Sequence, residues 1–287
     1  MSLFVSQELG RRIEQCDCAI LRDAAVSMRR HQPDLDLFSL DLAGGFAMHS
    51  LPGSPLNKVA GLGFEGTPTA EEWDDVEAAF ADRQSALQVE VSTLADSDIY
   101  AALSERGFKL VGFESILGQR IDVLADADRS SSRPADNAIS VARCESDDLE
   151  AWIDVVVSGF LVPDTQGVES HETFDRDMLE PVVREFAKID GFLRYLARID
   201  GQPAGAASMR VTNGIAQFCG SATLPEFRRR GVQTQFLATR VAEALASDAE
   251  IATVTTQPGS KSKQNSHKTG FDHLYDRAVF IKEPPVS

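Results

Sequence analysis

The stretch SATLPEFRRRGVQTQFL, Ser221 to Leu237, decides how the rest of the chain is interpreted. It places three consecutive arginines, Arg228 to Arg230, and then Gly231 immediately before a segment with helical apolar spacing. The N-terminus of a helix exposes about four backbone N–H groups without partners and carries roughly half a positive charge. Because cations are unfavourable at that end, we predict that an anion, most simply a phosphate group, binds there. The alternative is a solvated turn whose arginines face water.

The composition is that of a soluble globular protein with room for two domains: 287 residues, of which 43% are hydrophobic and 25% charged. The net charge of −16 argues against a general nucleic-acid binder, which needs a basic surface to neutralise phosphates. No apolar run approaches the roughly 18–20 residues needed to cross a bilayer. The N-terminal MSLFVSQELGRRIEQ also lacks the order of a signal peptide. We therefore expect a cytoplasmic protein that binds neither nucleic acid nor membrane.

The cysteines give no sign of a disulfide framework or a metal site. Cys16, Cys18, Cys144 and Cys219 are too few and too scattered for a set of disulfides. Cys16 and Cys18 form a C-x-C, but in a segment that looks helical and has no second ligand pair nearby. We interpret these two residues as small thiols packed in an amphipathic helix, and we predict no metal.

A turn-rich passage with few apolar residues, DADRSSSRPADN at 126–137, divides the chain into two halves. We predict a first domain at 1–125, a linker at 126–138 and a second domain at 139–287. Before residue 138 there are 12 basic and 23 acidic residues, and after it 16 and 21, so most of the excess negative charge lies in the first half. Both halves repeat one order of elements, and Gly107-Phe108 corresponds to Gly270-Phe271. An internal duplication is the simplest interpretation.

Apolar periodicity and turn residues locate the elements of each half. The first half is expected to contain a helix through Arg30, strands at 46–51 and 57–64, a helix at 71–83, a strand at 86–94, a helix at 96–107 and a strand at 108–121. The second half is expected to contain a strand at 139–144, helices at 147–161 and 171–187, strands at 192–201, 202–214 and 215–224, a helix at 231–247, a strand at 251–257, a short helix at 262–270 and a strand at 272–283. A buried stripe is predicted on the helix at 231–247, made by Phe236, Leu237, Val241, Ala244 and Leu245.

The stretch from Ser221 to Leu237 resembles the acyl-CoA loop of the GNAT superfamily of N-acyltransferases. In that family a strand leads to proline and an aromatic residue, and then to Arg/Gln-x-x-Gly-x-Gly/Ala at the start of a long helix. Arg228 matches the first position and Gly231 the first glycine, while Gln233 stands where the pattern prefers glycine or alanine. The later PGSKSKQNSHKTGF, at 258–271, resembles the next element of the family. The resemblance implies two α/β (α+β) domains, each a mixed, mostly antiparallel sheet flanked by helices.

The resemblance also implies that acetyl-CoA, or another acyl-CoA, is the cosubstrate. It assigns the diphosphate to the backbone N–H groups of Arg229, Arg230, Gly231, Val232, Gln233 and Thr234. It assigns the pantetheine arm to the end of the preceding strand, at Ser221, Ala222 and Thr223. Lys261, Lys263 and Lys268 are candidates for the 3′-phosphate, with surface solvation as the alternative, and Asn265 is a candidate polar residue on the cofactor side.

The first half lacks this loop. Its corresponding helix starts with Glu71, Glu72, Asp74 and Asp75. Carboxylates at a helix N-terminus satisfy the helix dipole and repel a diphosphate. We therefore expect the first half to be a degenerate duplicate that has lost cofactor binding.

Transfer of an acyl group to an amine needs a neutral amine, a polarised thioester oxygen and a protonated leaving thiol. The strands on either side of the loop helix carry no carboxylate, so the base is sought at His171 or Glu172, with a surface histidine or a water chain as alternatives. The tyrosine that the family places four residues before Gly-Phe is Ser266 here. His267 and Tyr275 are the nearest candidates for the acid, and packing is the alternative role of Tyr275.

The sequence thus predicts a tandem GNAT-like protein whose second half transfers an acyl group, most simply acetyl, to a primary amine of a small molecule or peptide. The negative charge favours a cationic acceptor. Two alternatives stay open: a non-catalytic acyl-CoA-binding or interaction protein, and a binder of nucleotide phosphates, although no P-loop lysine follows the glycine. An acyl-cysteine route through Cys219 has no supporting histidine or aspartate, and core packing is the simpler role.

The end of the chain carries one further expectation. Only one strand remains after the short helix at 262–270, whereas a domain of this family ordinarily ends with two. An uncovered strand edge is a liability because its backbone groups pair with other chains. We expect a strand of the first half, or of a second chain in a homodimer, to cover that edge.

Overall fold

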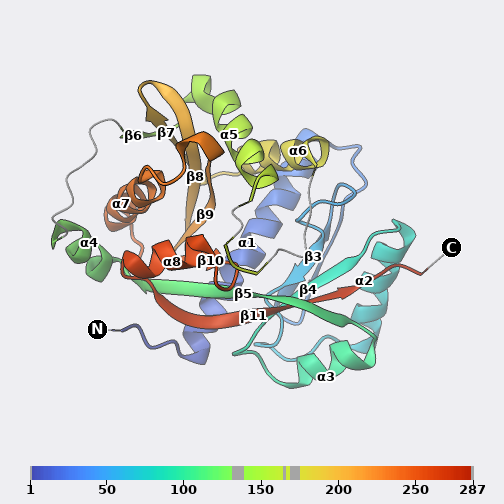
Figure 1. The fold of residues 1–287 in the computed structure, drawn as a ribbon. Coiled ribbons are helices and arrows are strands. Elements are labelled where there is room, and N and C mark those ends of the chain that lie inside the picture. Colours follow the sequence, from blue (N-terminus) through green and yellow to red (C-terminus); the bar gives the residue numbers. More distant parts are fainter. Residues whose placement is uncertain (1, 131–138, 164–165, 169–174, 286–287) are drawn as a thin grey trace. The chain divides into compact units, whose positions relative to one another are not determined.

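A computed structural model describes residues 2–130, 139–163, 166–168 and 175–285 (Figure 1). These residues form two compact units. The first unit consists of residues 5–114 and 275–285, and the second of residues 2–4 and the described residues within 115–168 and 175–274. Two strands, β5 (Lys109–Arg120) and β11 (Asp272–Lys282), contribute residues to both units. The units therefore do not follow the order of the chain.

The first unit contains a five-stranded sheet. Its elements before β5 are α1 (Gln7–His31), β1 (Phe38–Leu42), β2 (Gly45–His49), β3 (Lys58–Ala60), α2 (Ala70–Asp82), β4 (Leu87–Ser92) and α3 (Asp98–Glu105). Strands β1, β2 and β3 pair antiparallel in turn, β3 and β4 pair parallel, and β4 pairs antiparallel with β11. The fifth strand of this unit thus comes from the end of the chain.

The apolar residues of α2 recur at helical spacing and form the core of the first unit. Trp73, Val76 and Phe80 are buried and pack against the sheet strands. Helix α1 begins where the Ser6 hydroxyl accepts a hydrogen bond from the Leu9 amide at 3.1 Å. A serine in that position satisfies one of the backbone N–H groups that a helix start leaves free.

The second unit contains a six-stranded sheet in the order β6-β7-β8-β9-β10-β5. Its elements are α4 (Ile121–Ser130), β6 (Ile139–Arg143), η1 (Ser146–Asp148), α5 (Leu149–Leu161), α6 (Arg176–Phe186), β7 (Leu193–Ile199), β8 (Gln202–Thr212), β9 (Ile215–Thr223), η2 (Pro225–Phe227), α7 (Val232–Leu245), β10 (Ile251–Thr256) and α8 (Lys261–Lys268). All neighbours pair antiparallel except β9 and β10, which are parallel. The predicted mixed, mostly antiparallel sheet flanked by helices is confirmed.

Helices cover both faces of this sheet, and Figure 1 shows α5 and α7 on opposite sides of β7, β8 and β9. The α7 face buries Phe236, Leu237, Val241 and Ala244, as the sequence predicts. Leu245 is the exception: it is 46% exposed, so the predicted stripe stops one residue short of the helix end.

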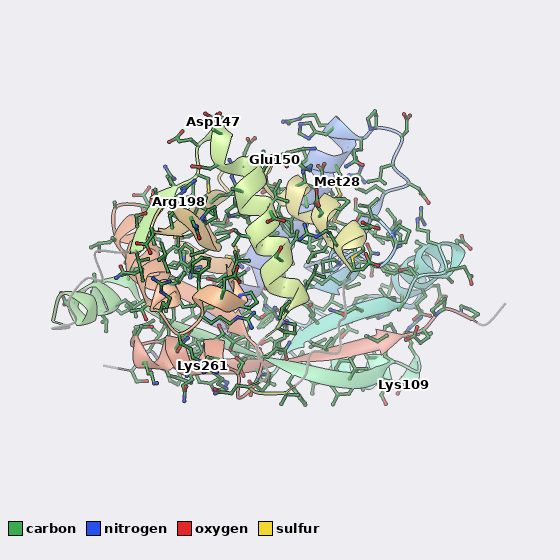
Figure 2. All side chains as sticks on the ribbon, turned by 45° about the horizontal axis from the view of Figure 1, so that its top comes forward. Met28, Lys109, Asp147, Glu150, Arg198 and Lys261 are labelled. Atoms are coloured by element: carbon green, nitrogen blue, oxygen red, sulfur yellow. The ribbon has the colours of Figure 1, made fainter. Side chains whose placement is uncertain are left out.

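On the other face, α5 and α6 form a second core together with residues of β7 and β8. A bidentate ion pair joins these two helices, with Arg184 donating to the Glu150 carboxylate at 2.6 and 2.9 Å. Glu150 lies at the start of α5 (Figure 2). The hairpin between β7 and β8 turns at Asp200 and Gly201, whose φ values of +51° and +79° are those a tight two-residue turn requires.

The two units share one order of strands and helices. In the first unit β3, α2, β4 and α3 precede the pairing of β4 with β11, and in the second β9, α7, β10 and α8 stand in the same order, with β10 paired to β5. Residues 115–120 of β5 pair with β10 from Ser115–Thr256 to Arg120–Ile251. A strand of the first half therefore covers the edge of β10, which confirms that expectation. The duplicated units thus each take their last strand from the other half of the chain.

Some elements differ from the prediction. Strand β1 and helix α4 were not predicted, and β3 has three residues where eight were expected. Helix α4 runs to Ser130, so it includes the first five residues of the predicted linker at 126–138. Residues 131–138 lie outside the described part of the chain. The domain boundaries at 125 and 139 stay predictions.

Candidate functional site

The arginine-rich loop joins β9 to α7 in the second unit. After Thr223 the chain makes the short turn η2, passes through Arg228 to Arg230, and enters the helix at Gly231. Gly231 is the N-cap of α7 with φ +92°, and Arg229 has φ +65°. Left-handed residues in such a loop turn successive backbone N–H groups toward one point, which makes a concave site for anions. Glycine suits the cap because a side chain is strained at that φ.

The backbone N–H groups at the start of α7 face no protein acceptor in the described part of the chain. Within the described residues, no acceptor is bonded to the N–H groups of residues 229–234, and the first helical bond is Gln235 N–H to the Gly231 carbonyl. Arg229, Arg230 and Gly231 are exposed. A Cβ added at Gly231 would meet only the Ile139 Cδ1 atom, at 3.8 Å. Among the described residues, the N-terminus of α7 is therefore exposed and has no side-chain cap.

The corresponding helix of the first unit is closed. The Thr69 hydroxyl accepts the Glu72 amide at 3.2 Å, and the Glu72 carboxylate accepts the Thr69 amide at 2.7 Å. This capping box occupies the N–H groups that a ligand would need and places a carboxylate at the positive end of the helix dipole. The two units thus differ at the point where an anion would bind.

Strands β9 and β10 separate before they end. Their parallel pairing stops at Phe218 and Val254, yet β9 continues to Thr223 and β10 to Thr256. A β-bulge lies just beyond that point: Gly220, with φ +56°, and Ser221 together face one residue of β8. A bulge bends its strand, so β9 diverges from β10 and leaves backbone groups free for another extended segment.

The side chain of Gln233 explains why the chain departs from the family pattern at that position. Its amide oxygen accepts the Ser221 hydroxyl at 2.9 Å, and its nitrogen donates to the Thr223 hydroxyl at 3.1 Å. Gln233 therefore ties the start of α7 to the free end of β9. The Arg228 side chain is also directed toward the end of β9, because its guanidinium donates to the carbonyls of Thr223 and Val162.

A shallow depression of about 520 Å³ lies along α8. It is lined by Gln166, Gly259, Ser260, Lys263, Gln264, His267 and Lys268. The His267 Nδ1 atom lies 3.0 Å from the Phe271 carbonyl, which can only accept a hydrogen bond, so Nδ1 donates. In the neutral ring Nε2 is then the atom that can take a proton. Lys263 donates to the Ser115 hydroxyl at 2.9 Å and Lys261 to Gln264 at 2.6 Å.

Comparisons with known proteins agree with this geometry. Residues 160–271 match the model of the acetyltransferase (GNAT) family. The second half of the chain contains a GNAT domain. No curated protein matches the chain in sequence.

Solved structures extend the likeness to nearly the whole chain. A tandem GNAT protein from the clavulanic acid biosynthesis pathway aligns with a TM-score of 0.64 at 14% identity, over 98% of this chain and 95% of its own. A GCN5-related N-acetyltransferase from Kribbella flavida aligns with a TM-score of 0.60 at 17% identity, over 92% and 96%. A third, from Sphaerobacter thermophilus, has a TM-score of 0.55 at 13% identity, over 88% and 77%. These likenesses concern the fold, and the first half is consistent with a second GNAT-like fold.

Tyr275 lies on β11, near the end of the chain. It belongs to the first unit, is buried, and its hydroxyl donates to the Glu14 carboxylate at 2.7 Å. Burial, and then the charge of Glu14, raise the pKa of Tyr275 well above its usual value. The role of Tyr275 as the acid stays a prediction, and its burial and its hydrogen bond also suit the alternative packing role. Glu172 and His171 lie outside the described residues, and their roles stay predictions.

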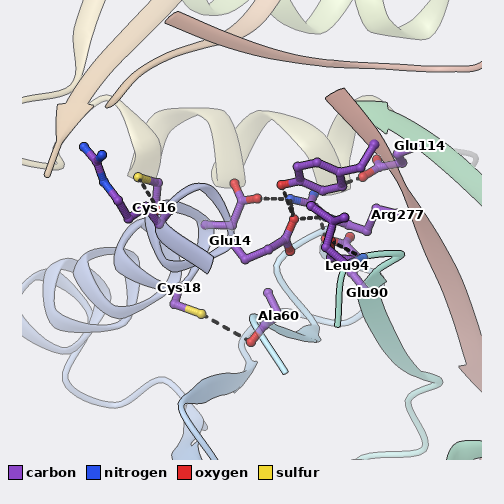
Figure 3. A network of polar contacts seen from close by, with 12 residues as sticks. Glu14, Cys16, Cys18, Ala60, Glu90, Leu94, Glu114 and Arg277 are labelled. Atoms are coloured by element: carbon purple, nitrogen blue, oxygen red, sulfur yellow. Dashed lines mark hydrogen bonds and ion pairs between the residues drawn. The ribbon is translucent and has the colours of Figure 1, made fainter. Parts of the chain in front are cut away.

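Through its hydrogen bond to Glu14, Tyr275 joins a buried charge cluster of the first unit, of which Figure 3 labels Glu14, Glu90, Glu114 and Arg277. Arg277 is its centre and pairs with four carboxylates: Glu14 at 3.0 Å, Glu114 at 3.2 Å, Glu90 at 3.4 Å, and Asp17. Burial raises the pKa of Glu14, and burial together with the charge of Glu90 raises the pKa of Glu114 to about 7. Burial therefore disfavours the ionised form of Glu14 and Glu114. At Glu90, by contrast, burial is outweighed by Lys58 and Arg277, which together lower the pKa of that carboxyl.

Two further predicted residues of the GNAT domain lie on α8. Ser266 is buried and its hydroxyl donates to the Ser262 carbonyl at 3.0 Å, so it is turned into its own helix. The Asn265 carbonyl accepts the Thr269 amide and hydroxyl, both at 3.2 Å. Its assignment to the cofactor stays a prediction.

Sequence reasoning missed two features of the GNAT domain. Arg240 is buried on α7, four residues after Phe236 and four before Ala244. This spacing puts an arginine on the apolar stripe of the helix, and that pattern in the sequence could have predicted its burial. The segment 166–168 also lies beside the loop before α8, where the Val168 amide donates to the Pro258 carbonyl at 3.1 Å. No sequence pattern indicated that contact.

Neither metal nor membrane features appear in the described chain. Its described residues contain no group of three or more histidine, cysteine or acidic side chains placed to hold a metal ion. Among the same residues, no helix has the length and apolar character required to cross a membrane.

Proposed function

We propose that this protein transfers an acyl group, most simply acetyl, from acyl-CoA to a primary amine, and that the second unit carries the reaction. The observation that supports the proposal most is the open start of α7, where the N–H groups of residues 229–234 have no acceptor among the described residues. The match of residues 160–271 to the acetyltransferase (GNAT) family supports it independently.

The residues around the open helix start fit a CoA molecule. The N–H groups of residues 229–234 would hold the diphosphate, which carries the negative charge that a helix N-terminus favours. The free end of β9, at Ser221 to Thr223, offers backbone groups to the pantetheine arm, because β10 no longer pairs there. Lys263 and Lys268 line the depression along α8 and supply positive charge for the 3′-phosphate.

The acceptor amine must lose a proton as it attacks the thioester. The N–C bond forms, the C–S bond breaks, and the electron pair leaves on the CoA sulfur. His267, a candidate acid from the sequence, is here also a candidate for taking up this proton: Nδ1 donates to the Phe271 carbonyl, which leaves Nε2 to accept. The net charge of −16 favours a cationic acceptor, a small amine or a peptide N-terminus.

The experiment compares two glycine variants. Gly231→Asp places a carboxylate at the N-terminus of α7. We expect it to weaken acetyl-CoA binding at least about tenfold, because the carboxylate repels the diphosphate. Gly201→Asp is the matched control: Gly201 also has a left-handed φ, +79°, with no atom within 4 Å of an added Cβ, but it lies in the β7–β8 turn. Both variants therefore carry the same backbone strain and the same added charge.

The measurements are the thermal shift with acetyl-CoA and with ATP, followed by thiol release with a panel of amines. Stabilisation of wild type and G201D, but not G231D, by acetyl-CoA supports the loop assignment. Preferential stabilisation by ATP, or equal binding by G231D, contradicts it. Binding without thiol release above hydrolysis favours the alternative, a non-catalytic acyl-CoA-binding protein.

A further inference from the structure

Arg240 is a buried cation of the second unit that the proposed roles leave unused. Its side chain comes from α7 and the residue is 1% exposed. Nε donates to the Phe236 carbonyl at 3.2 Å and NH1 to the Ser208 carbonyl at 3.1 Å. The guanidinium also stacks over the Phe218 ring, 4.7 Å from its centroid.

The charge of Arg240 has no counter-ion among the described residues. Among the described residues, no carboxylate forms an ion pair with it, and both of its hydrogen bonds go to neutral carbonyls. Burial lowers the pKa of Arg240 to about 10, and the groups that oppose this are the Cys219 thiol and the Tyr195 phenol. A buried charge without a partner is costly, and proteins normally pair it or remove it. Its retention here points to an anion that the free protein lacks.

The position of Arg240 identifies where that anion sits. Phe218, which the guanidinium contacts, is the last residue of β9 that pairs with β10. Ser208, whose carbonyl it binds, is the register partner of Cys219, immediately before the bulge at Gly220. Arg240 therefore lies under the point where the two strands begin to separate. In the proposed function the diphosphate binds at the start of α7 and the pantetheine arm along the end of β9, so the thioester would come next along β9, at this point.

We infer that Arg240 acts on the leaving group: its charge, which lies against Ser208 and Phe218 where β9 and β10 stop pairing, stabilises the CoA thiolate. This inference rests on the proposed function and adds a residue to it. When the C–S bond breaks, the electron pair remains on sulfur, and a nearby cation in a region of low dielectric favours that form. The proton of the attacking amine goes to a base, so sulfur need not receive it in the same step. Ser266 occupies the position of the tyrosine that would otherwise supply that proton.

The test measures the pKa of the CoA thiol bound to the full-length protein, from the ultraviolet absorption of the thiolate, with desulfo-CoA as the blank. An unperturbed thiol has a pKa near 8.5. We expect the pKa of the CoA thiol to be about one lower in the complex than in free CoA. At neutral pH this corresponds to about tenfold more thiolate. Arg240→Gln keeps a donor for the Ser208 carbonyl without the charge, and Arg240→Lys keeps the charge.

The expected pattern is a lowered thiol pKa in wild type and R240K, and a value near that of free CoA in R240Q. We also expect R240Q to lose about tenfold in kcat for acetyl transfer with its KM for acetyl-CoA unchanged. A bound thiol in wild type that titrates like free CoA overturns the inference, and this result needs no variant to fold. Equal thiol pKa values in wild type and folded R240Q also overturn it. If wild type does not bind CoA at all, the proposed function fails and this inference fails with it.

Discussion

Replacing Glu114 by glutamine tests whether the buried cluster of the first unit holds a proton at neutral pH. Glu114 lies in β5 and its carboxylate accepts from Arg277 at 3.2 Å. Its side chain is 22% exposed, and burial together with Glu90 raises its pKa to about 7 from a usual 4.5. Glutamine has the shape of the protonated acid and cannot ionise, so E114Q fixes the neutral form.

The magnitude follows from the pKa difference between the folded and unfolded chains. The pKa of Glu114 differs by about 2.5 between the two states. Because a pKa difference of one corresponds to about 1.36 kcal/mol, this amounts to about 3 kcal/mol. Because the pKa of Glu114 is higher in the folded chain, its contribution to stability is fully present below pH 4.5 and is lost as pH rises through 7. Partial exposure to water reduces the effect, so we expect E114Q to be about 2 kcal/mol more stable than wild type at pH 8. Near pH 4 the two proteins should be equally stable.

The assay is urea unfolding of both proteins at several values between pH 4 and pH 8, followed by circular dichroism. The control is Glu105→Gln, because Glu105 is exposed at the end of α3. We expect E105Q to match wild type at every pH. A difference between E114Q and wild type that does not change with pH, or a less stable E114Q at pH 8, would refute the account of the cluster. Three carboxylates still face Arg277 in the variant, so the loss of one is not expected to leave the guanidinium unpaired.

Two further variants separate structural from functional roles. Tyr275→Phe removes a buried hydroxyl that donates to Glu14, and for the packing role we expect it to cost about 1.5–3 kcal/mol of unfolding free energy while kcat for acetyl transfer stays within twofold of wild type. A large loss of kcat in a stable Y275F protein would instead support the prediction of Tyr275 as the acid. Thr69→Ala removes the N-cap of α2 and should cost about 1 kcal/mol in urea unfolding. The same T69A protein should bind acetyl-CoA as wild type does, since its α2 still begins with carboxylates; new binding at the first unit would contradict our interpretation of that helix.

Local patterns predicted most of the helices and strands because local chemistry determines them. Asp200-Gly201 adopts the two positive φ values that its turn needs, and α7 begins at Gly231, where a left-handed cap excludes most side chains. Strand β1 was missed although its five residues alternate apolar and polar side chains before a glycine turn, and helix α4 was missed because its end lies in the turn-rich passage interpreted as a linker. Local signals thus specified most elements, but the shortest strand signals and a helix that enters a turn-rich passage were overlooked.

The candidate site was predictable in part for the same reason. Three arginines and a glycine before a helix indicated an open anion site, and the structure leaves those N–H groups free of partners among its described residues. The role of Gln233 was not predictable, because its side chain bonds to Ser221 and Thr223, ten or more residues away. A sequence pattern identifies which position departs from a family but not what the new side chain contacts.

The sequence by itself determined the local conformations, the family resemblance, and the contrast between an acidic and a basic helix start. Only the tertiary structure decided that β5 and β11 each pair in the unit of the other half, that Tyr275 donates to Glu14, and that Arg240 is buried with no carboxylate partner among the described residues. The physical reason is that apolar periodicity specifies whether a residue is buried, whereas strand pairing and charge compensation depend on groups that are distant in the chain. Hydrogen bonds and ion pairs between such groups form only once the fold has brought them together.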